Sequence, residues 1–297
     1  MNRRTFGRDT GLTLRMLATS GMLGLLYIAF AAVLISYLNV GILPMLLIIG
    51  GLAFFQYFTS DKLALMASGA KVVSEEEAPQ LHAMVERLCA MADLPKPKVA
   101  VIDNDVPNAF ATGRNPKHAA VAVTTGLWSR LEPHEVEGVI AHELSHIANR
   151  DVLIMTLASF FAMLAGLLTR YALFFGGGRD RNGPPVWLIV FLVSVITYIV
   201  SFVLIRTISR YREYAADRGA SIITGAPENL MSALQKIASG MATIPKQDLR
   251  EVEALNAFFI IPTNLKSSFG ELFMTHPPME KRLAALAKIA REMGRVA

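Results

Sequence analysis

The sequence has little cysteine and, over three long stretches, no charge at all. Its one cysteine, Cys89, excludes an internal disulfide and is typical of a reducing compartment. No Asp, Glu, Lys, Arg or His occurs in residues 16–60, 152–169 or 182–205, and hydrophobic residues make up 53% of the 297-residue chain. Buried core helices are the alternative explanation, but uncharged stretches of this length favour a membrane protein.

Four membrane spans are expected within these stretches, because each is close to the length needed to cross a hydrocarbon core about 30 Å thick. The second is the shortest, with 17 residues. The four expected spans are Met16–Leu38, Ile42–Phe58, Val152–Thr169 and Pro185–Ile205. They divide the chain into a tail (1–15), a first hairpin (16–58), a soluble segment (59–151), a second hairpin (152–205) and another soluble segment (206–297).

The distribution of positive charge predicts the orientation of these spans. Of the 29 Lys and Arg residues, 26 lie in the tail and the two soluble segments. The positive-inside rule therefore places both termini and both soluble segments in the cytoplasm. The net charge of +5 fits this topology and contact with anionic lipid, while no motif supports a nucleic-acid partner. Residues 2–6 faintly resemble a twin-arginine export signal, but no clear small-x-small cleavage site follows, so an uncleaved anchor is expected.

Residues 142–146 read His-Glu-Leu-Ser-His, an HExxH motif. At 3.6 residues per helical turn His142 and His146 share one face, so their imidazoles can converge on one metal ion. Glu143 can then act as a general base toward a water that zinc activates. Pro133 and an apolar stripe before the motif predict the helix that this chemistry needs.

A third protein ligand is expected from another helix, and Glu213 is the best candidate. Asp217 lies four residues later, on the same face, where it can orient a ligand histidine. On the residues alone a solvated charged face is the competing interpretation, because neighbouring arginines can pair with both acids. These arginines are Arg210, Arg212 and Arg218.

The two soluble segments together are long enough for one domain of α+β type, mostly helical with a small sheet. In the first segment, Ser74 and Glu77 resemble a capping box that opens a helix ending near Asp93. The pattern then predicts a strand over 98–102 and a hairpin formed by 108–112 and 118–124. In the second segment, helices are predicted from the fourth span through Asp217, over 228–240 and over 279–293.

Four motifs together make the chain resemble the HtpX-type membrane zinc metalloproteases, which are related to the CAAX prenyl endopeptidases. They are Pro-Asn-Ala-Phe-Ala-Thr-Gly at 107–113, the HExxH motif extended to Asp151, Glu213-x-x-x-Asp217, and Thr-His-Pro-Pro at 275–278. The resemblance covers nearly the full length. It implies four membrane helices and a cytosolic zincin-like protease domain in a multi-pass protein of the inner, or plasma, membrane.

The resemblance also assigns roles to individual residues. It implies one Zn²⁺ per chain with His142, His146 and Glu213 as ligands, Glu143 as general base and Asp217 as a support for a ligand histidine. It also implies that Asn108 would bind substrate backbone on an edge strand and that His276 would stabilise the oxyanion. Since main-chain pairing suits broad substrates, Ala109, Phe110 and Ala111 are the expected strand. A turn or cap role for Asn108, and a role for His276 in opening the last helix, are the structural alternatives.

These features together predict an endopeptidase that cleaves membrane or membrane-proximal proteins at the cytosolic face. The resemblance adds protein quality control and a stress response. Protein substrates and the lipid bilayer are the expected partners, and the sequence does not define an oligomeric state. A metal transporter is one rival, disfavoured because the expected spans contain no ionisable ligand, and a catalytically silent zinc-binding scaffold is another.

Overall fold

The computed structural model describes residues 10–38, 42–175, 186–243 and 276–295. Most of the expected N-terminal tail, Pro185 of the fourth expected span and Thr275 of the last motif lie outside these residues. The chain forms two compact units. One contains the described residues of 8–58 and 154–208, and the other those of 59–153 and 209–297.

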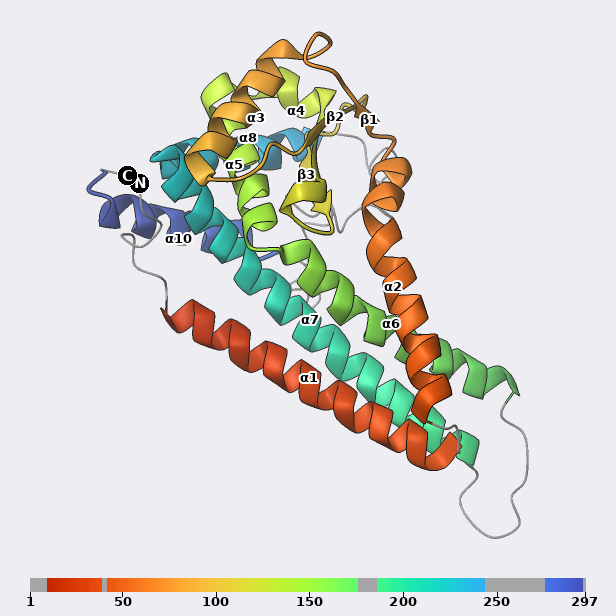
Figure 1. Ribbon diagram of the computed structural model, residues 1–297. Helices are drawn as coiled ribbons and strands as arrows, with labels where there is room; N and C mark the ends of the chain where they lie inside the picture. The colour runs from red at the N-terminus through yellow and green to blue at the C-terminus, as the bar shows by residue number, and fades with distance from the viewer. Residues whose placement is uncertain (1–9, 39–41, 176–185, 244–275, 296–297) are drawn as a thin grey trace. The chain divides into compact units, whose positions relative to one another are not determined.

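The first unit is built from long apolar helices (Figure 1). In the described part of the chain, three helices are long and apolar enough to cross a membrane, within 10–37, 153–170 and 186–224. A further helix covers the second expected span, which stays a prediction. The helices are α1 (Thr10–Leu38), α2 (Ile42–Ala67), α6 (Asp151–Phe175) and α7 (Val186–Thr224), and α2, α6 and α7 continue into the second unit.

Two apolar clusters hold α1 against α6 and the first part of α7. Leu23 and Tyr27 pack with Ala158 and Ile208 in one of them. The Tyr27 hydroxyl also donates a hydrogen bond to the Ala158 carbonyl, at 2.7 Å. Since a membrane offers no water for such a carbonyl or hydroxyl, this bond satisfies both groups inside the unit.

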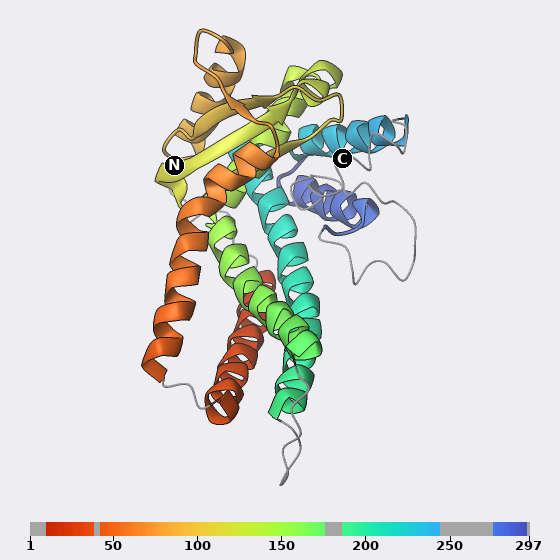
Figure 2. The ribbon, with the colours of Figure 1, turned by 90° about the vertical axis from the view of Figure 1, so that its right-hand side faces the viewer.

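The second unit contains a four-stranded mixed sheet in the order β1-β2-β4-β3, seen from the side in Figure 2. The β2–β4 pair is parallel and the other two pairs are antiparallel. The predicted strand over 98–102 is confirmed, and the predicted hairpin is confirmed with each strand starting one residue later. The strands are β1 (Lys71–Val72), β2 (Lys98–Ile102), β3 (Ala109–Gly113) and β4 (Ala119–Thr124).

Helices cover one face of this sheet and bury the main core of the unit. Val99, Val121 and Val123 of the sheet pack with Val139 and Ile140 of α5. The helices of this unit are α3 (Pro79–Ala92), α4 (Thr125–Arg130), α5 (Pro133–Ala148), α8 (Pro227–Thr243) and α10 (Met279–Glu292), together with the end of α7. The predictions for α5, α8 and α10, and for a helix running from the fourth span through Asp217, are confirmed.

The start of α3 differs from the prediction. Ser74 and Glu77 do form the reciprocal hydrogen bonds of a capping box, but they close an isolated turn. The helix itself begins at Pro79, whose fixed φ and missing N–H suit the first position. A capping box instead opens α5, where Glu132 and Glu135 exchange side-chain and main-chain hydrogen bonds around Pro133.

Candidate metal centre and active site

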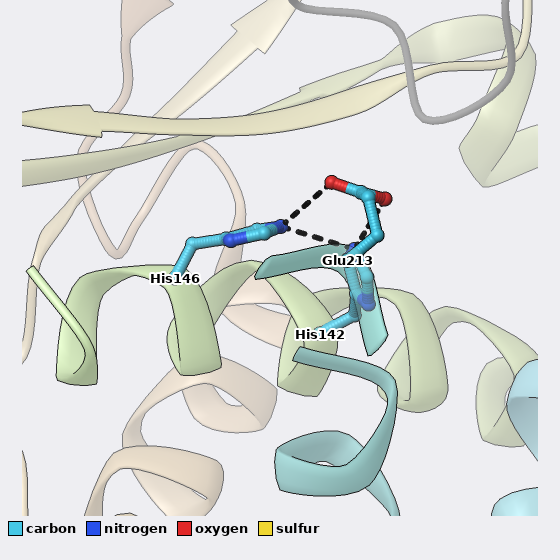
Figure 3. Close-up of side chains that lie close together, drawn as sticks. All are labelled: His142, His146 and Glu213. Atoms are coloured by element: carbon cyan, nitrogen blue, oxygen red, sulfur yellow. Dashed lines mark hydrogen bonds and ion pairs between the residues drawn. The ribbon is translucent and has the colours of Figure 1, made fainter. Parts of the chain in front are cut away.

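The HExxH motif lies on α5 and directs its two histidines toward one point (Figure 3). The Nε2 atoms of His142 and His146 are 3.2 Å apart. His142 is buried and His146 is partly buried. The convergence expected from the spacing of four residues is therefore present.

Glu213 reaches the two histidines from α7. Its carboxylate oxygens lie 3.6 Å from His142 Nε2 and 3.4 Å from His146 Nε2. One ligand atom from each of the three residues lies within 4.8 Å of the others, which is a geometry that could hold a metal ion. Glu213 and Asp217 are both buried, so this part of α7 is not a solvated charged face.

Each histidine has a carboxylate on its other ring nitrogen. Asp217 lies 3.0 Å from Nδ1 of His142, and Asp151 lies 2.6 Å from Nδ1 of His146. When Nδ1 donates to a carboxylate, the lone pair remains on Nε2, which is the nitrogen that faces Glu213. Two imidazoles in this tautomer and one carboxylate form a donor set that suits Zn²⁺.

The carboxylates also change the acidity of the two histidines. Burial disfavours protonation of both rings, but hydrogen bonds to the acids outweigh it. The pKa of His142 is raised by Asp217 and Glu213, and that of His146 is raised to about 10 by Asp151 and Glu213. A metal ion would therefore have to displace protons from this site in order to bind.

Glu143 lies beside the histidines and contacts the sheet. It is buried, and its Oε2 accepts a hydrogen bond of 2.8 Å from the main-chain N–H of Ala111 on β3. Burial raises the pKa of the Glu143 carboxyl above its ordinary value, although the neighbouring histidines oppose this shift. A carboxylate with a raised pKa is better matched to proton transfer near neutral pH.

Two further basic groups approach from the C-terminal part of the chain. Nδ1 of His276 lies 2.9 Å from Glu213 Oε2, so the structure brings this expected residue to the site. Arg282 of α10 is buried, contacts Asp217 through Nε at 2.9 Å and Nη2 at 2.6 Å, and lies 3.3 Å from Glu213. One guanidinium therefore neutralises both acids of the Glu213-x-x-x-Asp217 motif.

The residues expected to bind substrate lie on or next to β3, an edge strand of the sheet. The Asn108 carbonyl accepts a hydrogen bond from Thr124 N, and the Asn108 N–H donates to the Thr124 hydroxyl. Phe110 does not present its side chain to the histidines, because it is buried among Ala100, Ile102 and Ala122. Its contribution to the predicted substrate strand is thus limited to main-chain geometry.

Asp151 and Arg282 carry no role in the sequence interpretation, yet both contact the site. The signal for Arg282 is its place on the apolar stripe of α10, in line with Leu286 and Ile289, since a charge on a buried face requires a partner. Asp151 closes the extended HExxH motif, but it lies five residues after His146. At that spacing an unbroken helix would not bring the two side chains together.

This geometry defines a class: metallohydrolases in which two histidines and a general base on one helix meet a glutamate from another. Comparison with known proteins agrees, since the model of peptidase family M48 matches residues 75–290. Protease HtpX homolog 2 of Methanosarcina acetivorans is 53% identical over 294 residues, covering 98% of this chain and 99% of that protein. Protease HtpX homolog of Moorella thermoacetica is 52% identical over 299 residues, covering 98% of each chain.

The chain therefore belongs to peptidase family M48, as an HtpX-type zinc metalloprotease. The crystal structure of Ste24p from S. mikatae has the same fold, with a TM-score of 0.55 and 20% sequence identity. The match covers 94% of this chain and 67% of Ste24p. Together with the three apolar helices, membership of this family identifies a membrane metalloendopeptidase.

Proposed function

We propose that this protein is a zinc endopeptidase that cleaves membrane or membrane-proximal proteins, misfolded ones among them, at the cytosolic face of the inner or plasma membrane. The observation that carries the proposal is the convergence of His142, His146 and Glu213 beside the Glu143 carboxylate. Protein quality control is the physiological role that best fits such an enzyme.

The proposed ligands of the zinc ion are His142, His146 and Glu213. When bound, zinc would supply a Lewis acid that polarises the scissile carbonyl and makes water nucleophilic at neutral pH. Asp217 would keep His142 in the tautomer that presents Nε2. Arg282, which contacts both Asp217 and Glu213, would offset their mutual repulsion.

Glu143 is proposed as the general base that takes a proton from the attacking water. Its burial supports this role because desolvation raises its pKa, and its bond to Ala111 N fixes the position of the carboxylate. His276 is proposed to face the negative charge that develops on the scissile oxygen. Its Nδ1 lies 2.9 Å from the Glu213 carboxylate, so the ring lies beside the candidate metal ligands, where a donor to that oxygen would be needed.

The substrate is proposed to bind as an added strand on β3. Since the Asn108 carbonyl pairs with β4, the alternation of an antiparallel ladder turns the main-chain groups of Ala109 and Ala111 to the outer edge. The bond from Ala111 N to Glu143 lies on that edge, so while it holds the base, the groups left to pair with a peptide are those of Ala109 and the Ala111 carbonyl. Main-chain pairing is available to every extended peptide, so this mode suits an enzyme with many substrates.

Two rival functions predict different outcomes. A metal transporter would carry ions across vesicle membranes, and it is disfavoured because the expected spans contain no Asp, Glu, Lys, Arg or His. A zinc-binding scaffold would hold metal without cleaving peptides. The burial of Glu143 within reach of the candidate ligands favours an enzyme over either rival.

The test compares purified full-length wild type with Glu143→Gln in detergent. Zinc content by metal analysis should be unchanged, and cleavage of casein should fall by roughly 10²- to 10⁴-fold, as expected when a general base is removed. Glu137→Gln is the matched control, since Glu137 is on the same helix but pairs with Arg87 on the surface. Equal cleavage by wild type and Glu143→Gln would refute the assignment of the base, and no cleavage by wild type would favour the rivals.

A further inference from the structure

Asp151 is a buried acid that joins the two helices carrying the candidate metal ligands. Its exposed fraction is 1%, and it is the first residue of α6. One carboxylate oxygen lies 2.6 Å from Nδ1 of His146, and the other lies 2.9 Å from Nε of Arg212. Arg212 immediately precedes Glu213 on α7, so this chain of contacts runs from one ligand helix to the other.

The backbone between α5 and α6 brings Asp151 to this position. On a continuous helix, a residue five positions after His146 would point about 140° away from it. Arg150 instead has φ of 56°, in the left-handed region, so α5 ends and Asp151 turns back toward the preceding turn. Such a conformation is unfavourable for a residue other than glycine, and it persists where the surrounding contacts determine it.

The contacts of Asp151 have a counterpart on the other histidine. Asp217 contacts Nδ1 of His142 and is held by Arg282, just as Asp151 contacts Nδ1 of His146 and is held by Arg212. In both pairs an arginine compensates a buried carboxylate that faces a ring nitrogen. The site thus has two carboxylate–arginine pairs, one behind each imidazole.

We propose that Asp151, held by Arg212, is a positioning residue that fixes the ring orientation and tautomer of His146 for metal binding. The inference rests on the proposed zinc site. Because Arg212 is the residue next to Glu213, the Asp151–Arg212 pair also links His146 to Glu213. It thereby fixes the position of these two ligands, which lie on different helices, relative to each other. Partners of ligand histidines typically change metal affinity by 10- to 100-fold when they are replaced.

The test measures zinc affinity by competition with a chromophoric chelator, using full-length protein in detergent. Asp151→Asn preserves the shape of the side chain but removes its charge, and it should weaken zinc binding by roughly 10- to 100-fold. In the Co²⁺-substituted protein its visible absorption should shift, because the geometry around the ion changes. Asp61→Asn, which breaks an ion pair with Arg114 elsewhere in the same unit, should alter neither measurement.

Unchanged zinc affinity and an unchanged Co²⁺ spectrum in Asp151→Asn would overturn the inference. If the metal-free Asp151→Asn protein shows no melting transition, it is not folded, and Arg212→Gln is measured instead. Zinc binding by Arg212→Gln should be several-fold weaker than by the wild type. Equal zinc affinity of Arg212→Gln and wild type would overturn the inference. Failure of the proposed function can be told apart from failure of this inference. In that case the wild type itself would bind zinc but would not cleave casein. A wild type that binds no zinc would overturn both.

Discussion

Gly219→Ala should separate the two ligand helices. A Cβ at Gly219 of α7 would lie 2.5 Å from Oγ and 2.8 Å from Cβ of Ser145 on α5. Ordinary contacts between such atoms are 3.5–4.0 Å, so the helices must move apart by about 1 Å. Rotation of the serine cannot relieve the clash, because its Cβ is also too close and its hydroxyl already bonds the Ala141 carbonyl.

The size of the effect follows from what this contact positions. Ser145 precedes His146 by one residue, and Gly219 follows Glu213 by six residues, about 9 Å along α7. Metal–ligand distances tolerate only about 0.2 Å, whereas a 1 Å displacement at an active site can lower activity by about 10²-fold. Overpacking of this kind also costs roughly 1–3 kcal/mol of stability.

The assay is zinc affinity by chelator competition, together with casein cleavage and thermal melting. Gly166→Ala is the control, because its Cβ would meet the Tyr198 ring at an ordinary 3.6 Å. The double variant Gly219→Ala/Ser145→Gly should recover zinc binding, since it removes the atoms that clash. Wild-type zinc affinity and cleavage in Gly219→Ala would refute the reasoning, and so would a double variant that is no better than the single one.

Three further predictions concern protons, metal and stability. Zinc affinity should rise with pH up to about 10, because zinc must displace a proton from His146, and competition titrations at pH 6, 7 and 8 measure the slope. Removing the metal with a chelator should lower the melting temperature, and adding zinc back should restore it. At free zinc a thousand-fold above Kd, bound zinc should add about 4 kcal/mol to the free energy of unfolding. Lys236→Met should cost about 1 kcal/mol at pH 7, because Lys236, although half-exposed, pairs with the buried Glu135 at 2.8 Å. Burial would raise the pKa of Glu135, but hydrogen bonds from Lys236 and a serine lower it below its ordinary value. The stability that the Glu135–Lys236 pair contributes is therefore fully present above the unfolded-state pKa of about 4.3, and it should vanish as pH falls through the lowered pKa. Lys288→Met, on the surface, is the control in melts at pH 7 and pH 3, and an equal loss at both pH values would contradict the account.

Local sequence patterns predicted the elements that carry the site. The spacing of His142 and His146, with Pro133 at the start of their helix, predicted α5 and the direction of both rings. Alternation predicted β2 and the hairpin. Each of these depends on residues close in the chain, where periodicity and turn chemistry determine the outcome.

Contacts between distant segments were predicted less completely. From the residues alone, Glu213 could be either a metal ligand or a solvated acid. The sequence could not decide between them, because the burial of this part of α7 depends on α10, which is far along the chain. The role of Asp151 was not predicted, because its contact with His146 requires Arg150 to adopt the left-handed backbone conformation. Arginine does not favour that conformation. The start of α3 was misplaced because the Ser74 turn satisfies its own capping groups before the helix begins.

The hydrogen bond between Ala111 and Glu143 has a consequence for which peptide bond would be cleaved. In the proposed mode of binding, the strand that would align a peptide also contacts the proposed base, so the distance from base to peptide backbone would be set by one residue of β3. Because the side chains of Ala109 and Phe110 are buried, selection among peptides would rest on pockets beside the strand, and changes there should alter which peptides are accepted while leaving the cut aligned with the base. Redesign of selectivity and preservation of catalysis would in this way be separable tasks.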